Sequence, residues 1–293
     1  MSAAPRPGTV AVVGSINADE VYRVERIPRP GETVTARQHT SMSGGKGANA
    51  AVACALSGAR TVLVGAVGDD AAGALALDGL RAAGVDVSAV ARLDGRPTGT
   101  AVVTVAADGE NTVLVSPGAN GALTPAHVDA SLRALPRGGV VLTNLEIGTD
   151  AAEAALRGAV ALGAAPVLNP APAHDVPDGL LVHGTVLTPN EHEAAVLTGY
   201  EDPERAATAL QQRTGAPVVV TLGARGALVV RAGTSTLVPA PRVTAVDTTG
   251  AGDAFNGALV ARLARGDDLL FAVERAVRTA ARSTQHEGAR LRP

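Results

Sequence analysis

Short apolar runs alternate with longer Ala- and Leu-rich stretches along most of the chain. Runs rich in β-branched residues predict strands, whereas the longer stretches predict helices. We expect strands at 10–13, 61–64, 140–144, 167–168, 186–187, 218–222 and 227–231, and helices at 48–56, 71–83, 151–162, 251–264 and 269–282. This alternation predicts an α/β fold in which residues 1–293 form a single domain, with helices on both faces of a mostly parallel central sheet.

Two segments, 18–42 and 98–115, have no helical period. Both alternate apolar and polar residues, as half-buried strands do, and turn signals such as Pro30-Gly31 and Asp108-Gly109 interrupt them. We interpret them as excursions that form a small accessory β sheet, which would act as a lid that excludes water from a site in the α/β core. The alternative is a pair of ordinary surface hairpins.

Composition narrows the class of protein further. Hydrophobic residues make up 46% of the 293 residues and aromatic residues only 1%, so Ala, Val and Leu must fill the core. The net charge of −3 lacks the basic excess of a nucleic-acid-binding surface, and no apolar run approaches the length of a membrane span, so neither partner is expected. The first residues lack the apolar segment of a signal peptide and Cys54 is the single cysteine, which predicts a cytoplasmic, reducing location.

The segment Asp247-Thr-Thr-Gly-Ala-Gly-Asp253 is the most informative motif. We expect a strand at 242–246 to lead into it and residues 250–252 to open the next helix. Backbone amides at such a helix N-terminus suit a phosphate in transfer. Asp253 lies where these amides converge and would accept the proton of an attacking hydroxyl, with its pKa lowered by the helix dipole. The alternative is an acidic residue that only stabilises the first helical turn.

A second glycine-rich segment is Gly44-Gly-Lys-Gly-Ala-Asn49. It is not a Walker A loop, because Gly47 follows the lysine where Ser or Thr would hold magnesium. The glycines instead open the helix predicted at 48–56, and the side chains of Lys46 and Asn49 would hold sugar hydroxyls. The alternative is a flexible turn that leads into a helix.

Three further polar residues follow predicted strands. Asn17 and Asp19 come after the strand at 10–13, and Glu146 comes after the strand at 140–144. Ligands of open α/β sheets bind outside the carboxyl ends of the strands. Residues two apart in an extended segment point to the same side, so Asn17 and Asp19 match the donors and acceptors of vicinal hydroxyls. The alternatives are turn chemistry at a strand exit and a capping role.

Two segments in the second half of the chain suit a nucleotide. Thr221-Leu-Gly-Ala-Arg-Gly226 forms a tight turn at the end of a predicted strand. Asn190 and Glu193 begin a helix with i, i+3 spacing, so that one helical face addresses phosphate and, through water, Mg²⁺. The alternatives are a hairpin turn for the first segment and an N-cap with an acidic first turn for the second.

These motifs together resemble those of the PfkB-type carbohydrate kinases, and within them the ribokinases most closely. The resemblance runs from about residue 10 to about residue 288. It rests on the two glycine-rich motifs, and on Gly14-Ser-Ile-Asn-Ala-Asp19, Pro30-Gly-Glu-Thr33, Gly118-Ala-Asn120, Asn169-Pro-Ala-Pro172 and Thr188-Pro-Asn190. It implies the ribokinase-like fold, in which the two excursions form the lid.

The resemblance also implies a role for each candidate residue. Asp253 would be the catalytic base, and Gly250, Ala251 and Gly252 would form the anion hole. The sugar would contact Asn17, Asp19, Gly45, Lys46, Asn49, Glu146 and Asp253. The ATP site would include Asn190, Thr221, Gly223, Gly226 and Gly252, with Glu193 in the magnesium–phosphate network. A monovalent cation, K⁺, would be held by Asp247, Thr249, Ser283, His286 and Gly288.

The implied activity is transfer of the γ-phosphoryl group of ATP to a sugar hydroxyl, with D-ribose as acceptor and ribose 5-phosphate as product. The resemblance further implies Mg²⁺ and K⁺ as cofactors and a homodimer formed through the lid. Kinases for fructose, deoxyribose or adenosine stay open, as does a catalytically silent sugar-binding protein on the same fold. A dinucleotide-binding oxidoreductase is excluded, because Gly14-Ser-Ile-Asn17 does not supply Gly-x-Gly-x-x-Gly after the first strand.

Overall fold

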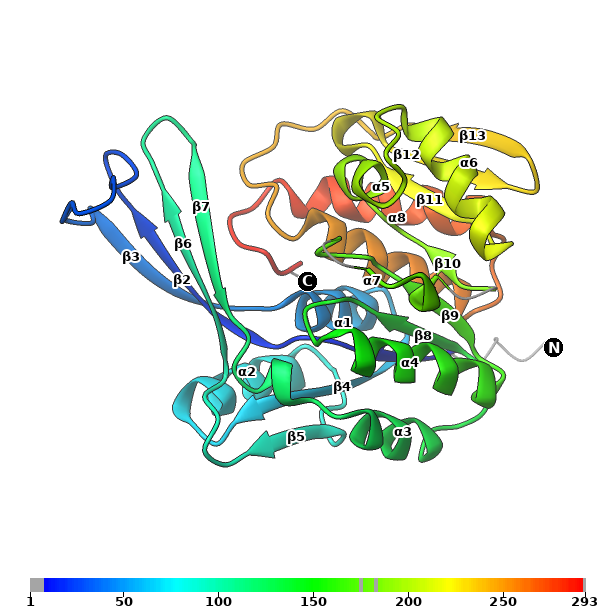
Figure 1. Cartoon of the computed structure of the whole chain (residues 1–293), viewed down its shortest axis with the longest axis horizontal. Coiled ribbons are helices and arrows are strands. Elements are labelled where there is room, and N and C mark those ends of the chain that lie inside the picture. The colour runs from blue at the N-terminus through cyan, green and yellow to red at the C-terminus, as the bar shows by residue number, and fades with distance from the viewer. Residues whose placement is uncertain (1–7, 174–175, 182–183, 292–293) are drawn as a thin grey trace.

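The computed structural model describes residues 8–173, 176–181 and 184–291. Within these residues the chain forms a nine-stranded sheet flanked by helices and a four-stranded sheet that projects from the body as an arm (Figure 1). The prediction of an α/β core with a small additional β sheet is therefore confirmed.

The large sheet is parallel over most of its width. Its order is β13 (Thr234–Val238), β12 (Ala227–Arg231), β11 (Val218–Thr221), β10 (Val186–Leu187), β9 (Ala165–Leu168), β8 (Val140–Thr143), β1 (Thr9–Val13), β4 (Arg60–Gly68) and β5 (Val90–Leu93). Only β12 and β13 run antiparallel to their neighbours. The carboxyl ends of the parallel strands therefore meet at one edge of the sheet, where ligands of such folds bind.

Helices cover both faces of this sheet, because successive strand residues point to opposite sides. Val10 and Val12 pack with α1 (Lys46–Leu56) and α7 (Ala251–Leu263), while Ala11 and Val13 face the opposite layer. The first layer also contains α2 (Ala71–Ala82) and α8 (Leu269–Ser283), and the opposite layer contains α3 (Pro125–Arg133), α4 (Thr149–Leu162), α5 (Glu191–Thr198) and α6 (Pro203–Thr214).

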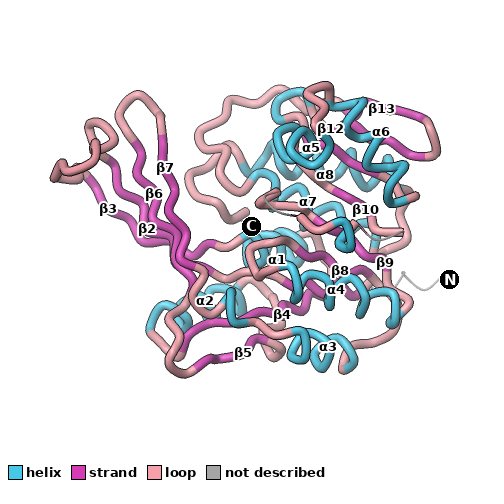
Figure 2. The backbone as a smooth tube through the Cα atoms, viewed as in Figure 1, coloured by secondary structure: helices cyan, strands magenta, loops and turns pink. Residues whose placement is uncertain are grey.

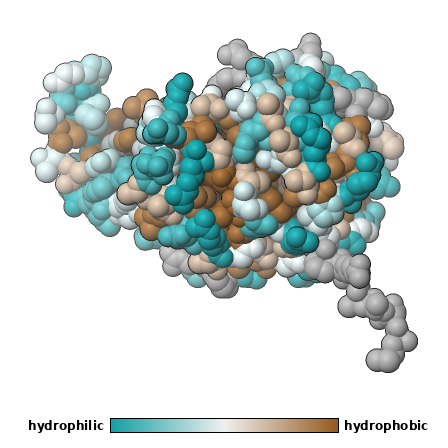
Figure 3. Space-filling view, turned by 90° about the horizontal axis from the view of Figure 1, so that it is seen from below, coloured by the Kyte–Doolittle hydropathy of each residue, from teal (hydrophilic) through white to brown (hydrophobic). Residues whose placement is uncertain are grey.

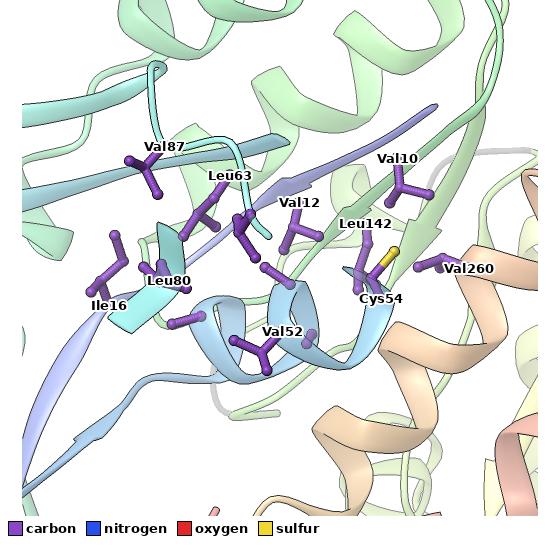
Figure 4. Packing of buried hydrophobic residues seen from close by; sticks show 14 of the residues in the cluster. Val10, Val12, Ile16, Val52, Cys54, Leu63, Leu80, Val87, Leu142 and Val260 are labelled. Atoms are coloured by element: carbon purple, nitrogen blue, oxygen red, sulfur yellow. The ribbon is translucent and has the colours of Figure 1, made fainter. Parts of the chain in front are cut away.

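The core between α1, α7 and the sheet is built from small aliphatic side chains. Figure 4 shows Cys54 of α1 between Leu142 of β8 and Val260 of α7, in the cluster that also contains Val10 and Val12 of β1. Helix α7 approaches the backbone of α1 closely: a Cβ on Gly257 would lie 2.3 Å from the carbonyl oxygen of Ala50. A glycine at this position therefore lets the two helices pack in contact, which brings their N-termini together.

The second sheet has the order β3 (Gln38–Gly44), β2 (Asn17–Arg23), β6 (Gly99–Val105) and β7 (Asn111–Ser116). Strand β2 pairs antiparallel with β3 and parallel with β6. The chain reaches this sheet soon after β1, and β3 leads directly into α1 (Figure 2). The base of the projecting sheet is thus fixed to the same strand and helix that begin the α/β core.

One predicted element is wrong. Residues 242–246 form no strand, although their composition favours one. Their neighbourhood explains the difference, since the backbone amide of Val246 donates to the carbonyl of Thr284 at 2.7 Å and not to a sheet partner. The described helices include none that is long and apolar enough to cross a membrane.

Candidate active site

The N-termini of α1 and α7 meet at the carboxyl edge of the large sheet, beside the base of the second sheet (Figure 1). The side-chain amide of Asn49, in the first turn of α1, donates to Oδ2 of Asp253, in the first turn of α7, over 2.9 Å. Both side chains are buried. The two glycine-rich motifs, about two hundred residues apart in the sequence, therefore form one site.

Burial dominates the ionisation of Asp253. It raises the pKa of this carboxyl to about 6, although the charge of Lys46 and the hydrogen bond from Asn49 both lower it. The nearby charge of Glu146 raises it further. The expectation that the helix dipole would lower the pKa of Asp253 is wrong, because removal of the carboxylate from water outweighs the dipole.

Lys46 supplies the positive charge of this centre. Its side chain is half-buried, and its pKa is raised chiefly by the carboxylate of Asp253. Glu146 and Glu193 raise it as well, against the effect of burial. Lys46 therefore remains a protonated ammonium among three carboxylates, placed to stabilise negative charge that enters the site.

The N-terminus of α7 presents backbone amides to an open space. Gly250 caps the helix with a φ of 72°, and the amide of Ala251 donates to the carbonyl of Thr248 at 3.2 Å. None of the hydrogen bonds within the described residues uses the amide of Gly252 or Asp253. A Cβ added at Gly252 would have nothing within 4 Å. This is the arrangement expected of an anion site at a helix N-terminus.

Glu146 holds the turn that precedes α1. Its Oε2 accepts hydrogen bonds from the hydroxyl of Ser15 at 2.5 Å and from the backbone amide of Lys46 at 3.1 Å. Gly45, immediately before the helix, has a φ of 90°, which a residue with a Cβ rarely adopts. Asn144 fixes the backbone of Glu146, since its Oδ1 accepts from the backbone amide of Glu146 at 3.1 Å.

Asn17 and Asp19 lie two residues apart on β2 and so share one face of the second sheet. Asn17 Oδ1 accepts a 2.7 Å hydrogen bond from the side chain of Asn120. Asn120 also bonds the backbone amide and carbonyl of Ile16, at 2.9 and 3.1 Å. Burial, followed by the charge of Glu146, raises the pKa of Asp19 to about 6, whereas Arg290 lowers it.

The candidate nucleotide residues form a separate group. Asn190 and Glu193 make a reciprocal capping box at the start of α5, each side chain accepting from the other's backbone amide at 2.8 Å. Thr221 pairs with Asn190 through an isolated β-bridge. Burial raises the pKa of Glu193, with opposing contributions from Asn190 and Lys46. The electrostatic interaction between Glu193 and Lys46 thus links this group to the charged residues around Asp253.

The turn after β11 is built from glycines. Gly223 has a φ of 56° and open space around it, while a Cβ on Gly226 would lie 2.0 Å from the carbonyl of Val238. The amide of Leu222 donates to the carbonyl of Gly226 at 2.8 Å and closes the turn. The hairpin turn and the capping pair named as alternatives are therefore present; neither geometry prevents contact with a nucleotide.

Asp247 ties the loop before α7 to the segment after α8. Its two carboxylate oxygens accept from the backbone amides of Thr249 and Gly288, at 2.8 and 2.9 Å. Burial opposes ionisation, but hydrogen bonds from Thr249 and Gly288 outweigh it and hold the pKa of Asp247 below its usual value. The hydroxyl of Ser283 donates to its own helix at Ala280. The amide of His286 donates to the carbonyl of Ser283 at 3.4 Å.

Sequence reasoning assigned no role to several residues that organise this site. Ser15 and Asn144 orient Glu146, and Asn120 orients Asn17. Arg290 reaches the site from the end of the chain. Asn120 belongs to the Gly118-Ala-Asn120 motif and Ser15 to Gly14-Ser-Ile-Asn-Ala-Asp19, so a signal was present for both. The contacts of Asn144 and Arg290 depend on backbone paths that no local pattern specifies.

Comparisons with known proteins agree with this fold and show the family. The family model of the pfkB family carbohydrate kinases matches residues 8–293. The chain is 37% identical to the ribokinase of Schizosaccharomyces pombe, over 96% of this chain and 93% of the relative. It is 38% identical to a bifunctional ribokinase/ribose-5-phosphate isomerase A of Fructilactobacillus sanfranciscensis, over 87% of this chain and 48% of that relative, so it spans about half of the bifunctional protein.

A solved structure extends the likeness to three dimensions. The structure of Arabidopsis thaliana ribokinase complexed with ribose and ATP superposes with a TM-score of 0.86 at 30% identity, covering 96% of this chain and 94% of that chain. The fold and the site therefore define a carbohydrate kinase. The chain belongs to the pfkB family, as the motifs implied.

Proposed function

We propose that this chain catalyses transfer of the γ-phosphoryl group of ATP to the primary hydroxyl of D-ribose, giving ribose 5-phosphate and ADP. The observation that carries the proposal is the position of Asp253: a buried carboxylate beside unpaired amides at a helix N-terminus, within range of the charge of Lys46. Relatives named ribokinase that match most of the chain favour ribose as the acceptor.

The residues around Asp253 suit a polyhydroxylated ligand. Asn49 and Lys46 offer donors, and the carboxylate of Asp19 offers an acceptor. In this proposal Asn17, Gly45 and Glu146 complete the sugar site, either by direct contact or by holding the turn before α1. The primary hydroxyl of the sugar then points to Asp253.

The reaction would begin with the hydroxyl hydrogen-bonded to Asp253. As the hydroxyl oxygen forms its bond to the γ-phosphorus, the bond between this phosphorus and the β–γ bridging oxygen breaks, and the proton passes to the carboxylate. A base with a pKa of about 6 is largely ionised at neutral pH and still accepts a proton readily. Backbone amides of residues 250–252 and the Lys46 ammonium would stabilise charge on the transferring group.

Nucleotide and cations would be held by the other two groups. Asn190, Thr221, Gly223 and Gly226 would line the ATP site. Because the Glu193 carboxylate is buried and bonded to Asn190, it would act on Mg²⁺ through water, and Mg²⁺ would neutralise phosphate charge. The ionised Asp247, with Thr249, Ser283, His286 and Gly288, supplies oxygen ligands of the kind that K⁺ prefers.

A cytoplasmic location stays a prediction. We also infer a homodimer formed through the second sheet. Pairing aligns Val21, Val103 and Val113 across three strands on the face that also carries Asp19. The opposite face is mixed: Glu20 and Thr104 share it with Val102 and Leu114. In Figure 3, viewed from below, hydrophobic side chains lie among hydrophilic ones on the projecting arm. A second copy of the chain would cover such an apolar face.

Coupled ADP release with MgATP tests the activity. The acceptors are ribose, 2-deoxyribose, fructose and adenosine, with a sugar-free control, and each is measured in K⁺ and then in Na⁺. Ribose-dependent turnover that K⁺ increases is the expected result. Turnover with a different acceptor would keep the kinase and replace ribose, whereas binding of ribose without turnover would indicate a catalytically silent protein.

A further inference from the structure

The segment that follows α8 crosses the opening of the candidate site. In Figure 1 it runs, in red, from the end of α8 toward the base of the second sheet. Two contacts fix its backbone: the amide of Gly288 donates to Asp247 at 2.9 Å, and the carbonyl of Ala289 lies against Gly250, where a Cβ would be only 2.1 Å from the carbonyl oxygen. The next residue, Arg290, is therefore held at the entrance of the sugar site.

The side chain of Arg290 extends among the residues assigned to the sugar. Its Nε lies 3.4 Å from Oδ1 of Asn49, the residue whose amide bonds Asp253. A Cβ on Gly79 of α2 would be 3.4 Å from Nη1 of Arg290, so the guanidinium reaches from α1 to α2. Burial lowers the pKa of Arg290, opposed by the charge of Asp19.

Two buried polar atoms at this place lack partners among the described residues: Nη2 of Arg290, a donor, and Oδ1 of Asp19, an acceptor. The charge of each group shifts the pKa of the other, yet neither of these two atoms has a hydrogen-bond partner in the described part of the chain. A buried donor and a buried acceptor without partners cost free energy, which a ligand that satisfies both would recover.

We propose that Arg290 is a specificity-determining residue that, together with Asp19, reads a pair of vicinal hydroxyls on the sugar. One hydroxyl donates to the free oxygen of Asp19, and the adjacent hydroxyl accepts from Nη2 of Arg290. The inference rests on the proposed function, since it concerns the acceptor of the same reaction. It adds a residue from the end of the chain to a recognition site otherwise built from β2, α1 and α7.

The proposal predicts which sugars are rejected. In the furanose ring of ribose, the vicinal hydroxyl pairs are those at positions 1 and 2 and at positions 2 and 3, so the 2-hydroxyl belongs to both. In the same furanose ring 2-deoxyribose offers no vicinal pair and would leave either the guanidinium or the carboxylate unpaired. Sites built to hydrogen-bond a hydroxyl discriminate strongly against ligands that lack it. We expect Arg290 to contribute roughly 10- to 100-fold to the preference for ribose.

The test compares two variants. Arg290→Met keeps an unbranched side chain but removes the hydrogen-bond donors, and Arg290→Lys keeps the positive charge but removes the planar guanidinium group. Arg278→Met is the matched control, because Arg278 is exposed on α8 and pairs with Glu274. Kinetics with ribose and 2-deoxyribose, calorimetric binding of both sugars, and thermal unfolding are measured for each protein.

In Arg290→Met we expect the KM for ribose to rise roughly 10- to 100-fold with kcat within about threefold, and the ribose preference to fall by a similar factor. Arg290→Lys should recover part of the binding but little of the preference. An unchanged preference overturns the proposal, as does tighter ribose binding by Arg290→Met, which would make the arginine a competitor of the sugar. If the parent turns over no ribose, the proposed function fails, and the calorimetric preference for ribose over 2-deoxyribose still decides on Arg290.

Discussion

The side-chain amide of Asn49 donates to the carboxylate of Asp253 over 2.9 Å, across the contact between α1 and α7. This bond joins the two glycine-rich motifs of the chain. It exists because Gly257 allows α7 to approach the backbone of α1, which sets the first turns of both helices side by side. The proposed base therefore depends on helix packing as much as on its own side chain.

Replacement of Asp253 by Asn keeps the volume of the side chain and an acceptor for Asn49, but removes the base. We expect kcat to fall by roughly 10²–10⁴ while ribose binding is largely retained. Coupled ADP release and calorimetric sugar binding measure the two quantities. Asp150→Asn is the matched control, because Asp150 also lies in the first turn of a helix, α4, and is exposed. Turnover of Asp253→Asn within tenfold of the parent would contradict the assignment.

The same substitution should change how stability depends on pH. The pKa of Asp253 is raised from 3.8 to about 6 in the folded protein, so the folded state binds a proton more readily than the unfolded state. The ionised carboxylate of Asp253 therefore lowers the free energy of unfolding. This effect is complete above pH about 6 and disappears as the pH falls toward 3.8. We expect Asp253→Asn to raise the free energy of unfolding at pH 8 by on the order of 1–3 kcal/mol.

Denaturant unfolding at several pH values checks this prediction. The substitution also removes the carboxylate that pairs with the Lys46 ammonium, which reduces the gain in stability. The informative quantity is therefore how the gain in stability changes with pH. The difference between Asp253→Asn and the parent should shrink between pH 6 and pH 4. A difference that stays constant across this range would mean that the carboxyl group is not desolvated.

The sequence predicted the strand–helix alternation well because strands buried on both faces appear as uninterrupted Val-rich runs. It missed α3 and α6 among the described helices, since their polar faces and Pro starts leave a weak apolar period. The strand expected at 242–246 fails for a different reason. Its residues have strand propensity, but the chain there bonds to Thr284 and not to a sheet edge.

For the site, the sequence identified the side chains but not their contacts with one another. The closeness of Asn49 and Asp253 follows from packing between distant segments, and burial reverses the expected direction of the Asp253 pKa. The position of Arg290 depends on anchors at Asp247 and Gly250 that local patterns do not encode. Local propensity thus specifies elements, while tertiary contacts specify the environment of each side chain.

Asn120 positions the strand that carries Asn17. Its side chain bonds both backbone groups of Ile16 and the side chain of Asn17, so Asn120→Ala would leave three polar groups without this partner. We expect a loss of about 1–3 kcal/mol of stability and a roughly tenfold rise in the KM for ribose, with a smaller effect on kcat. Kinetics and denaturant unfolding measure both, and Asn111→Ala on exposed β7 is the control. Loss of stability with an unchanged KM would make the role of Asn120 purely structural.

Gly250 and Gly252 should respond differently to a methyl group. At Gly250 a Cβ meets the carbonyl of Ala289 and the backbone is left-handed, so Gly250→Ala should cost at least about 1–2 kcal/mol and lower activity. At Gly252 the space is open, so Gly252→Ala should leave stability within about 0.5 kcal/mol. Its methyl group would enter the proposed phosphate site and lower kcat roughly 10- to 100-fold. Full activity of Gly252→Ala would move the phosphate away from this helix end.

The apolar face of the second sheet predicts self-association. Strand β7 is exposed along its length, and Val113, 56% exposed, lies on the same face as Val21 and Val103. Thr112 is its neighbour on the opposite face. A glutamate buried in an apolar interface without a partner is strongly unfavourable, whereas the same charge on the outer face stays in water. We therefore expect the parent and Thr112→Glu to be dimers by light scattering, and Val113→Glu to be a monomer with unchanged circular dichroism. A monomeric parent at the highest soluble concentration, or a dimeric Val113→Glu, would show that this face does not form the interface.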